Sequence, residues 1–274
     1  MQHEILDWCI VWGMNEQVDV ISRIQAGGIL DGIHWAYTSA VSRTLADYSE
    51  DAGYDAAWLG NTRFTLFRDR LDRVFSCGKY ALQANDDSTA GLDLVQVELT
   101  ERDIETMPTI SPNRVRRADL NHSPGWLFED VRFLLASCEF GKIEVLPWPQ
   151  KSPTKQQVAK QSNPDPQPTL FDRFADDELA DTVAPVDETF DVDTFVVAHT
   201  LDAVSQKREL VFGRPRLNEG GGEAWHWFEN LLTGPIPPGD QQDVPKRTGL
   251  DSVPDAPVRL RRKAERGNVA GGAA

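Results

Sequence analysis

Residues 1–83 carry apolar side chains at intervals of three and four, the period of a helix with one apolar face. A first helix is expected after Asn15, which can cap it, and before the glycine pair at 27–28. A second is expected over about 29–49, and a third from near Thr62. Their matching stripes predict a small helical bundle. The stripes are Val18, Ile21 and Ile24, then Ile33, Tyr37, Val41, Leu45 and Tyr48, then Phe64, Phe67, Leu71, Val74 and Phe75.

The pattern changes in residues 84–149, which are expected to form a small α/β part. Apolar residues crowd together over 92–99 and predict a strand. A helix is expected over 125–138, where apolar side chains recur at helical spacing. A second short strand is expected over 142–146, because Pro147 ends it.

Residues 150–193 show neither period and are rich in Pro, Gln, Ser and acids. Such a segment cannot bury enough apolar surface to offset the entropy of ordering it, so we predict a disordered linker. Residues 234–274 are dominated by Pro, Gly, Asp and Gln and are predicted to be a disordered tail with a basic end.

Two strands, at 194–200 and 208–212, are expected to form a hairpin in a C-terminal part that spans 194–233 and ends in a Trp-rich segment. Two strands alone are marginally stable, so the hairpin should pack on the first 148 residues. The predicted fold class is therefore α+β. The hairpin side chains expected to be buried are Val196, Val197, Leu210 and Phe212.

The charged residues are unevenly distributed along the chain. Of the 274 residues, 40% are hydrophobic and 26% are charged, with a formal net charge of -15. Acids gather in the linker and bases in the tail. A net-negative body argues against an extended nucleic-acid surface, because phosphate contact needs clustered Lys and Arg, although a local contact stays open.

The three cysteines, Cys9, Cys77 and Cys138, are odd in number and far apart, which is typical of reduced thiols in a cytosolic protein. The N-terminus lacks the basic start and long apolar core of a signal peptide, and the best apolar run, 8–12, is too short to span a bilayer. We expect a cytoplasmic protein with no membrane contact.

An apolar pair, Leu170 and Phe171, interrupts the polar linker. The run Gln167-Pro-Thr-Leu170-Phe171 resembles the Gln-x-x-Leu-Phe peptides by which bacterial replication and repair proteins dock on the DNA polymerase sliding clamp. The resemblance implies that Gln167 hydrogen-bonds at the pocket rim while Leu170 and Phe171 fill the pocket. Pro168 departs from the pattern, in which Leu is commoner there. The alternative is an amphipathic turn, including Phe174, that folds back on the body.

Arginines cluster in two folded regions and in the tail. Those of the third helix, Arg63, Arg68, Arg70 and Arg73, could contact phosphate, but pairs such as Asp69–Arg73 favour a solvated face. The better candidates for phosphate or nucleic-acid contact lie in a loop and in the tail: Arg114, Arg116, Arg117, Arg261 and Arg262.

No standard enzyme motif is present. The five histidines are far apart without metal-ligand spacing, and neither a P-loop nor a GxSxG turn occurs. We expect no metal and no cofactor. The main hypothesis is a non-enzymatic adaptor in a bacterial DNA transaction (repair, mobile-element or phage-defence) that docks through the linker peptide. The alternatives are a structural subunit of a multi-protein complex and a nucleic-acid-processing enzyme with an unrecognised site near His34, Arg63 or His122.

Overall fold

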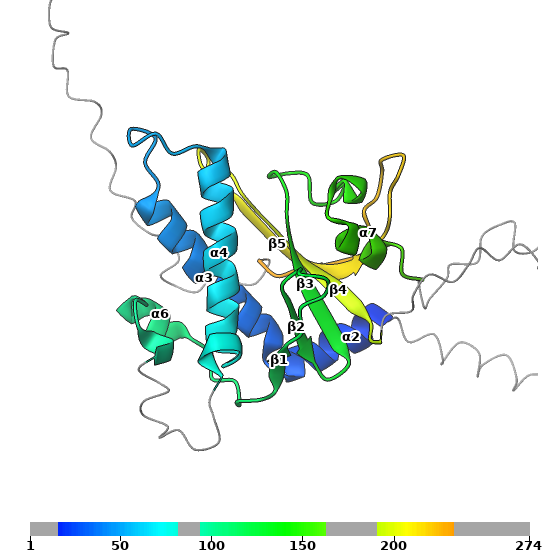
Figure 1. Cartoon of the computed structure of the whole chain (residues 1–274), viewed down its shortest axis with the longest axis horizontal. Coiled ribbons are helices and arrows are strands. Elements are labelled where there is room, and N and C mark those ends of the chain that lie inside the picture. The colour runs from blue at the N-terminus through cyan, green and yellow to red at the C-terminus, as the bar shows by residue number, and fades with distance from the viewer. Residues whose placement is uncertain (1–15, 82–93, 163–190, 233–274) are drawn as a thin grey trace, which may run out of the picture. The chain divides into compact units, whose positions relative to one another are not determined.

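Among the residues that the structure describes, six strands form one sheet, and helices lie on both of its faces (Figure 1). The computed structural model describes residues 16–81, 94–162 and 191–232, all within the first of two compact units, Met1–Gly234. The strands lie side by side in chain order. They are β1 (Val115–Arg117), β2 (Gly125–Phe128), β3 (Val131–Ser137), β4 (Thr194–Leu201), β5 (Arg208–Pro215) and β6 (Trp225–Asn230).

Neighbouring strands are antiparallel except β3 and β4, which run parallel. A parallel pair needs a crossover connection, and part of that connection packs on one face of the sheet. It contains η2 (Trp148–Gln150) and α7 (Pro153–Ala159). The register places Ser137, the last residue of β3, beside His199 of β4, so the carboxyl ends of both strands are adjacent.

The sheet lies between two hydrophobic cores. The larger core is formed with α2 (Glu16–Ala26), α3 (Ile29–Asp47) and α4 (Ala56–Val74), and the smaller one with residues 143–159. All eight residues of β4 are buried, as expected of a strand covered on both faces. Successive side chains alternate between the cores: Phe195 and Val197 enter the larger one, and Val196 and Ala198 the smaller.

Local residues explain where the helices begin and end. The predicted break between the first two helices is confirmed, and Gly28 adopts the left-handed φ of 72° that favours glycine. The third helix begins earlier than predicted, at Ala56, because the Asp55 side chain caps it by accepting a hydrogen bond from the Trp58 backbone N–H at 2.8 Å. A short helix, α6 (Glu101–Thr106), begins with a capping box between Thr100 and Asp103.

The structure confirms the α+β class and the C-terminal hairpin. β4 and β5 pair antiparallel, and the four side chains predicted to be buried there have no exposed surface. They enter the two cores that the preceding helices and strands line. The Trp-rich segment adds the edge strand β6.

Three predicted elements of the middle part are wrong. Residues 125–138 form β2, a turn and β3 instead of a helix. The sheet is buried on both faces, so apolar residues occupy consecutive positions and the two-residue alternation of a strand is lost. Residues 94–96 are helical and 142–146 form turns, so neither described stretch is a strand. The linker boundary at 150 was also predicted too early, because α7 buries Val158 and Ala159 in the smaller core.

One buried arginine, Arg214 of β5, joins distant parts of the chain. Its Nε donates to Glu16 at 2.7 Å, its Nη1 to the Ser162 carbonyl at 3.1 Å, and its Nη2 to Asp193 at 2.9 Å. The guanidinium therefore holds together the start of α2, the chain just after α7 and the residue that precedes β4.

A second charged cluster centres on Asp69 of α4. Its carboxylate accepts hydrogen bonds from Arg70 at 2.8 Å, Arg73 at 2.7 Å and Tyr80 at 2.7 Å, and pairs with Lys79 at 2.9 Å. Burial alone raises the pKa of Asp69, but the hydrogen bonds from Arg73, Lys79 and Tyr80 outweigh it and lower that pKa from 3.8 to about 2.

Substituting Asp69→Asn tests this cluster. A carboxylate whose folded-state pKa is depressed stabilises the protein above its unfolded pKa, and that contribution is lost as pH falls from about 4 to about 2. We expect the variant to unfold more easily than the wild type at neutral pH, with the difference shrinking across that window. Denaturant unfolding at a series of pH values measures it. Asp47→Asn, which removes an exposed partner of Arg43, is the control; a pH-independent gap for Asp69→Asn would contradict the assignment.

Candidate functional site

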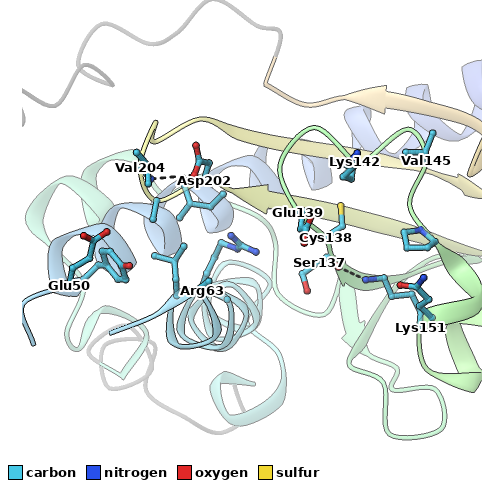
Figure 2. Close-up of a pocket in the computed structure, with 18 residues that line it drawn as sticks. Glu50, Arg63, Ser137, Cys138, Glu139, Lys142, Val145, Lys151, Asp202 and Val204 are labelled. Atoms are coloured by element: carbon cyan, nitrogen blue, oxygen red, sulfur yellow. Dashed lines mark hydrogen bonds between the residues drawn. The ribbon is translucent and has the colours of Figure 1, made fainter. Parts of the chain in front are cut away.

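A cavity of about 760 Å³ opens at the carboxyl ends of the parallel strands β3 and β4 (Figure 2). Four parts of the chain line it: the α3–α4 connection with the start of α4, the end of β3, the loop beyond β3, and the β4–β5 turn. Its volume is typical of small-molecule sites, and ligands commonly bind beyond the carboxyl ends of parallel strands.

Arg63 of α4 lines this cavity with a side chain that is almost wholly buried, at 4% exposure. Its Nε donates to Nδ1 of His199 at 3.1 Å. Figure 2 shows its terminal nitrogens directed toward Ser137 and Cys138. Among the described residues no carboxylate lies within ion-pair distance of it, and burial lowers the pKa of the guanidinium.

Arg63 differs in this from the other buried arginines that the structure describes. Arg70 and Arg73 share the Asp69 carboxylate, and Arg214 pairs with Glu16 and Asp193. A buried charge is costly unless a partner compensates it. Among the described residues, Arg63 lacks the compensation that the other three buried arginines receive.

His199 fixes the orientation of the Arg63 side chain through this hydrogen bond. The imidazole is fully buried, packs edge-to-face on Phe67 at 5.1 Å between ring centres, and lies 5.9 Å from the Tyr37 ring. Burial first, and then the charges of Arg63, Lys155 and Lys151, lower its pKa well below 6.5. The ring is therefore neutral; since Nδ1 accepts from Arg63, its proton lies on Nε2, which has no partner in the described structure.

More positive charge stands on the opposite side of the cavity. Lys142 and Lys151 line it, and Lys151 donates from Nζ to the Ser137 carbonyl at 2.7 Å. The acids that line the cavity offer less compensation. Glu50 and Glu139 are exposed, and Asp202 accepts hydrogen bonds within its own turn.

The remaining wall is mostly apolar. Leu59 and Leu201 are buried in it, Tyr48 is half-buried, and Val145 and Val204 are exposed at 47% and 88%. The wall therefore combines the cations Arg63 and Lys151 with buried apolar side chains and exposed polar ones.

The thiol and hydroxyl groups that line the cavity are not activated for nucleophilic attack. Burial raises the pKa of Cys138 to about 11, so this thiol is protonated at neutral pH. Within the described structure, neither Cys138 nor the Ser137 hydroxyl has a hydrogen-bonded base. Both groups thus lack the activation that a catalytic nucleophile needs.

The predicted basic loop does not form a single site. The Arg114 guanidinium lies 5.3 Å from the centre of the Phe128 ring, whereas Arg117 lies over Trp126 and binds Asp72 and Asp119. Arg116 is exposed. The other predicted site residues lie outside the described residues: Gln167, Leu170, Phe171, Arg261 and Arg262.

The predicted solvated face of the third helix is wrong for three of its arginines, because Arg63, Arg70 and Arg73 are buried. Of the positions named for an unrecognised enzyme site, Arg63 lines the cavity, but His34 and His122 do not. Lys151, Ser137 and His199, which stand around Arg63, were missed.

The described part of the chain contains no cluster of three or more His, Cys, Asp or Glu that could hold a metal ion. No described helix is long and apolar enough to cross a membrane. No protein-family model, curated protein or solved structure matches this chain.

His199→Asn should alter how stability depends on pH. The unfolded histidine takes up a proton below about pH 6.5, whereas the buried one does not. The free energy of unfolding of the wild type therefore decreases as the pH is lowered, by about 1.4 kcal/mol for each pH unit. Asparagine has no titrating group, and its Oδ1 can accept the Arg63 bond. We expect denaturant unfolding between about pH 6.5 and pH 5 to show a shallower slope for the variant. Equal slopes would mean that His199 is protonated in the folded state.

Proposed function

We propose that the protein binds a small organic anion in the cavity beside Arg63. The observation that supports this is the buried guanidinium facing the cavity without a carboxylate partner among the described residues. An uncompensated charge destabilises a fold, so such a group is expected where a ligand supplies the opposite charge.

The hydrogen bond to His199 suits Arg63 to this role. It occupies Nε and leaves Nη1 and Nη2 to hold a carboxylate or phosphate through two parallel bonds. Because His199 already holds the Arg63 guanidinium in place, this side chain loses little conformational entropy when the ligand binds. Because the guanidinium is buried, its attraction to the negative charge of the ligand is less screened by water.

Arg63→Gln is the decisive substitution. The amide nitrogen of glutamine stands where Nε stood, so the bond to His199 can survive while the terminal charge is removed. Because the lost charge is uncompensated, we expect the ligand-free variant to unfold at the same temperature as the wild type or higher. Benzoate or phenyl phosphate should stabilise the wild type, by about 2.7 kcal/mol at a hundred times Kd, but not the variant.

Arg43→Gln is the matched control, since it removes an exposed guanidinium from α3 and should leave binding unchanged. Thermal unfolding and titration calorimetry provide the measurements. A strongly destabilised Arg63→Gln protein, together with a wild type that binds neither anion, would make Arg63 a structural residue.

A second proposal comes from the sequence. The run at Gln167, Leu170 and Phe171 supports docking on a bacterial DNA polymerase sliding clamp, and with it an adaptor role in a DNA transaction. The two proposals are compatible, because the peptide and the cavity involve different residues.

Titration of the full chain with a sliding clamp tests the docking peptide. We expect micromolar affinity, typical of short peptides that lose conformational entropy on binding, and loss of binding when Leu170 and Phe171 are both changed to Ala. The control changes Leu179 and Phe190 of the same linker to Ala, which removes similar side chains outside the motif. Absence of wild-type binding, or equal loss in the control, would overturn the proposal.

A further inference from the structure

We infer that the anion is a phosphomonoester whose organic group is apolar or aromatic. This inference rests on the proposed function of the cavity and narrows its ligand class. Three features support it: the number of cations, the hydroxyl between them, and the apolar remainder of the wall.

Arg63 and Lys151 approach Ser137 from two sides. In Figure 2 the Arg63 guanidinium and the Lys151 ammonium face each other across Ser137. Lys151 uses one hydrogen for the Ser137 carbonyl at 2.7 Å, which leaves two for a ligand. In the described structure Lys151 is not within ion-pair distance of a carboxylate. The two uncompensated positive charges of Arg63 and Lys151 match a dianion better than the single charge of a carboxylate.

The Ser137 hydroxyl adds a neutral hydrogen-bonding group between the two charges. Ser137 is paired with His199 in the parallel register, and alternation along β3 points its side chain to the same face as Leu135. That face is the one from which Arg63 approaches His199. A tetrahedral phosphate can take bonds from a guanidinium, an ammonium and a hydroxyl arranged on different sides, whereas a planar carboxylate presents only two oxygens.

The rest of the wall specifies the organic group. Leu59 and Leu201 supply buried apolar surface, and the half-buried Tyr48 offers an aromatic ring. Glu50 and Asp202 also line this part, but Glu50 is exposed and Asp202 accepts hydrogen bonds within its own turn. The hydroxyl groups of a buried sugar would therefore face Leu59 and Leu201, which is unfavourable. An alkyl or aryl group fits this surface.

Titration calorimetry of the full-length protein with three probes tests the inference. Phenyl phosphate has both the dianion and the ring, benzoate has the ring with a planar monoanion, and inorganic phosphate has the tetrahedral anion without a ring. We expect phenyl phosphate to bind roughly tenfold or more tightly than either of the others. Its affinity should fall below about pH 6, where a phosphomonoester gains a proton, while that of benzoate should not.

Two substitutions assign the preference to residues. Ser137→Ala and Lys151→Met should each weaken phenyl phosphate by roughly tenfold and change benzoate much less. Lys160→Met, which removes an exposed lysine at the end of α7, is the charge-matched control and should change neither.

The outcomes separate this inference from the function on which it rests. If benzoate binds as tightly as phenyl phosphate and Arg63→Gln abolishes both, the anion site stands and the phosphate assignment is wrong. If inorganic phosphate binds as tightly as phenyl phosphate, the assignment of the organic group is wrong. If the wild type binds none of the three probes, both the inference and the proposed function fail.

Discussion

The parallel pairing of β3 with β4 determines most of what surrounds it. Antiparallel strands can be joined by a tight turn, but parallel ones require the chain to return to the starting edge. The returning chain, through η2 and α7, buries the second face of the sheet, and Lys151 lies on it. The same pairing brings Ser137 and His199 side by side at the strand ends, so the cavity, its hydroxyl and the support for Arg63 all follow from one register.

Electrostatics distinguishes the cavity from the rest of the fold. Elsewhere the buried guanidiniums of the described residues are matched with carboxylates: Arg70 and Arg73 with Asp69 of the same helix, and Arg214 with Glu16 and Asp193 of distant segments. At the cavity the positive groups are supported by a neutral imidazole and a backbone carbonyl. Such partners fix the direction of the positive groups without neutralising their charge, and the proposed anion binding depends on that charge.

The helices could be predicted because each has one apolar face and clear end signals. The strands of the middle part could not, since burial on both faces removes the alternation on which strand prediction depends. The residues of the cavity could not be predicted for another reason, because the side chains that meet there are far apart in the sequence. Arg63 and His199 are 136 positions apart, and Ser137 and Lys151 are 14 positions apart. One local signal was present. The neighbours of Arg63 at three and four positions are Leu59, Gly60, Leu66 and Phe67, so no acid could pair with it along the helix.

The contacts of Arg214 have a consequence for how the chain tolerates change. One guanidinium binds both Ser162 and Asp193, so the two ends of the segment between them are fixed beside each other by the body itself. Substituting Arg214 would therefore release Ser162 and Asp193 from each other, and both from Glu16 of α2, through a change at a single position.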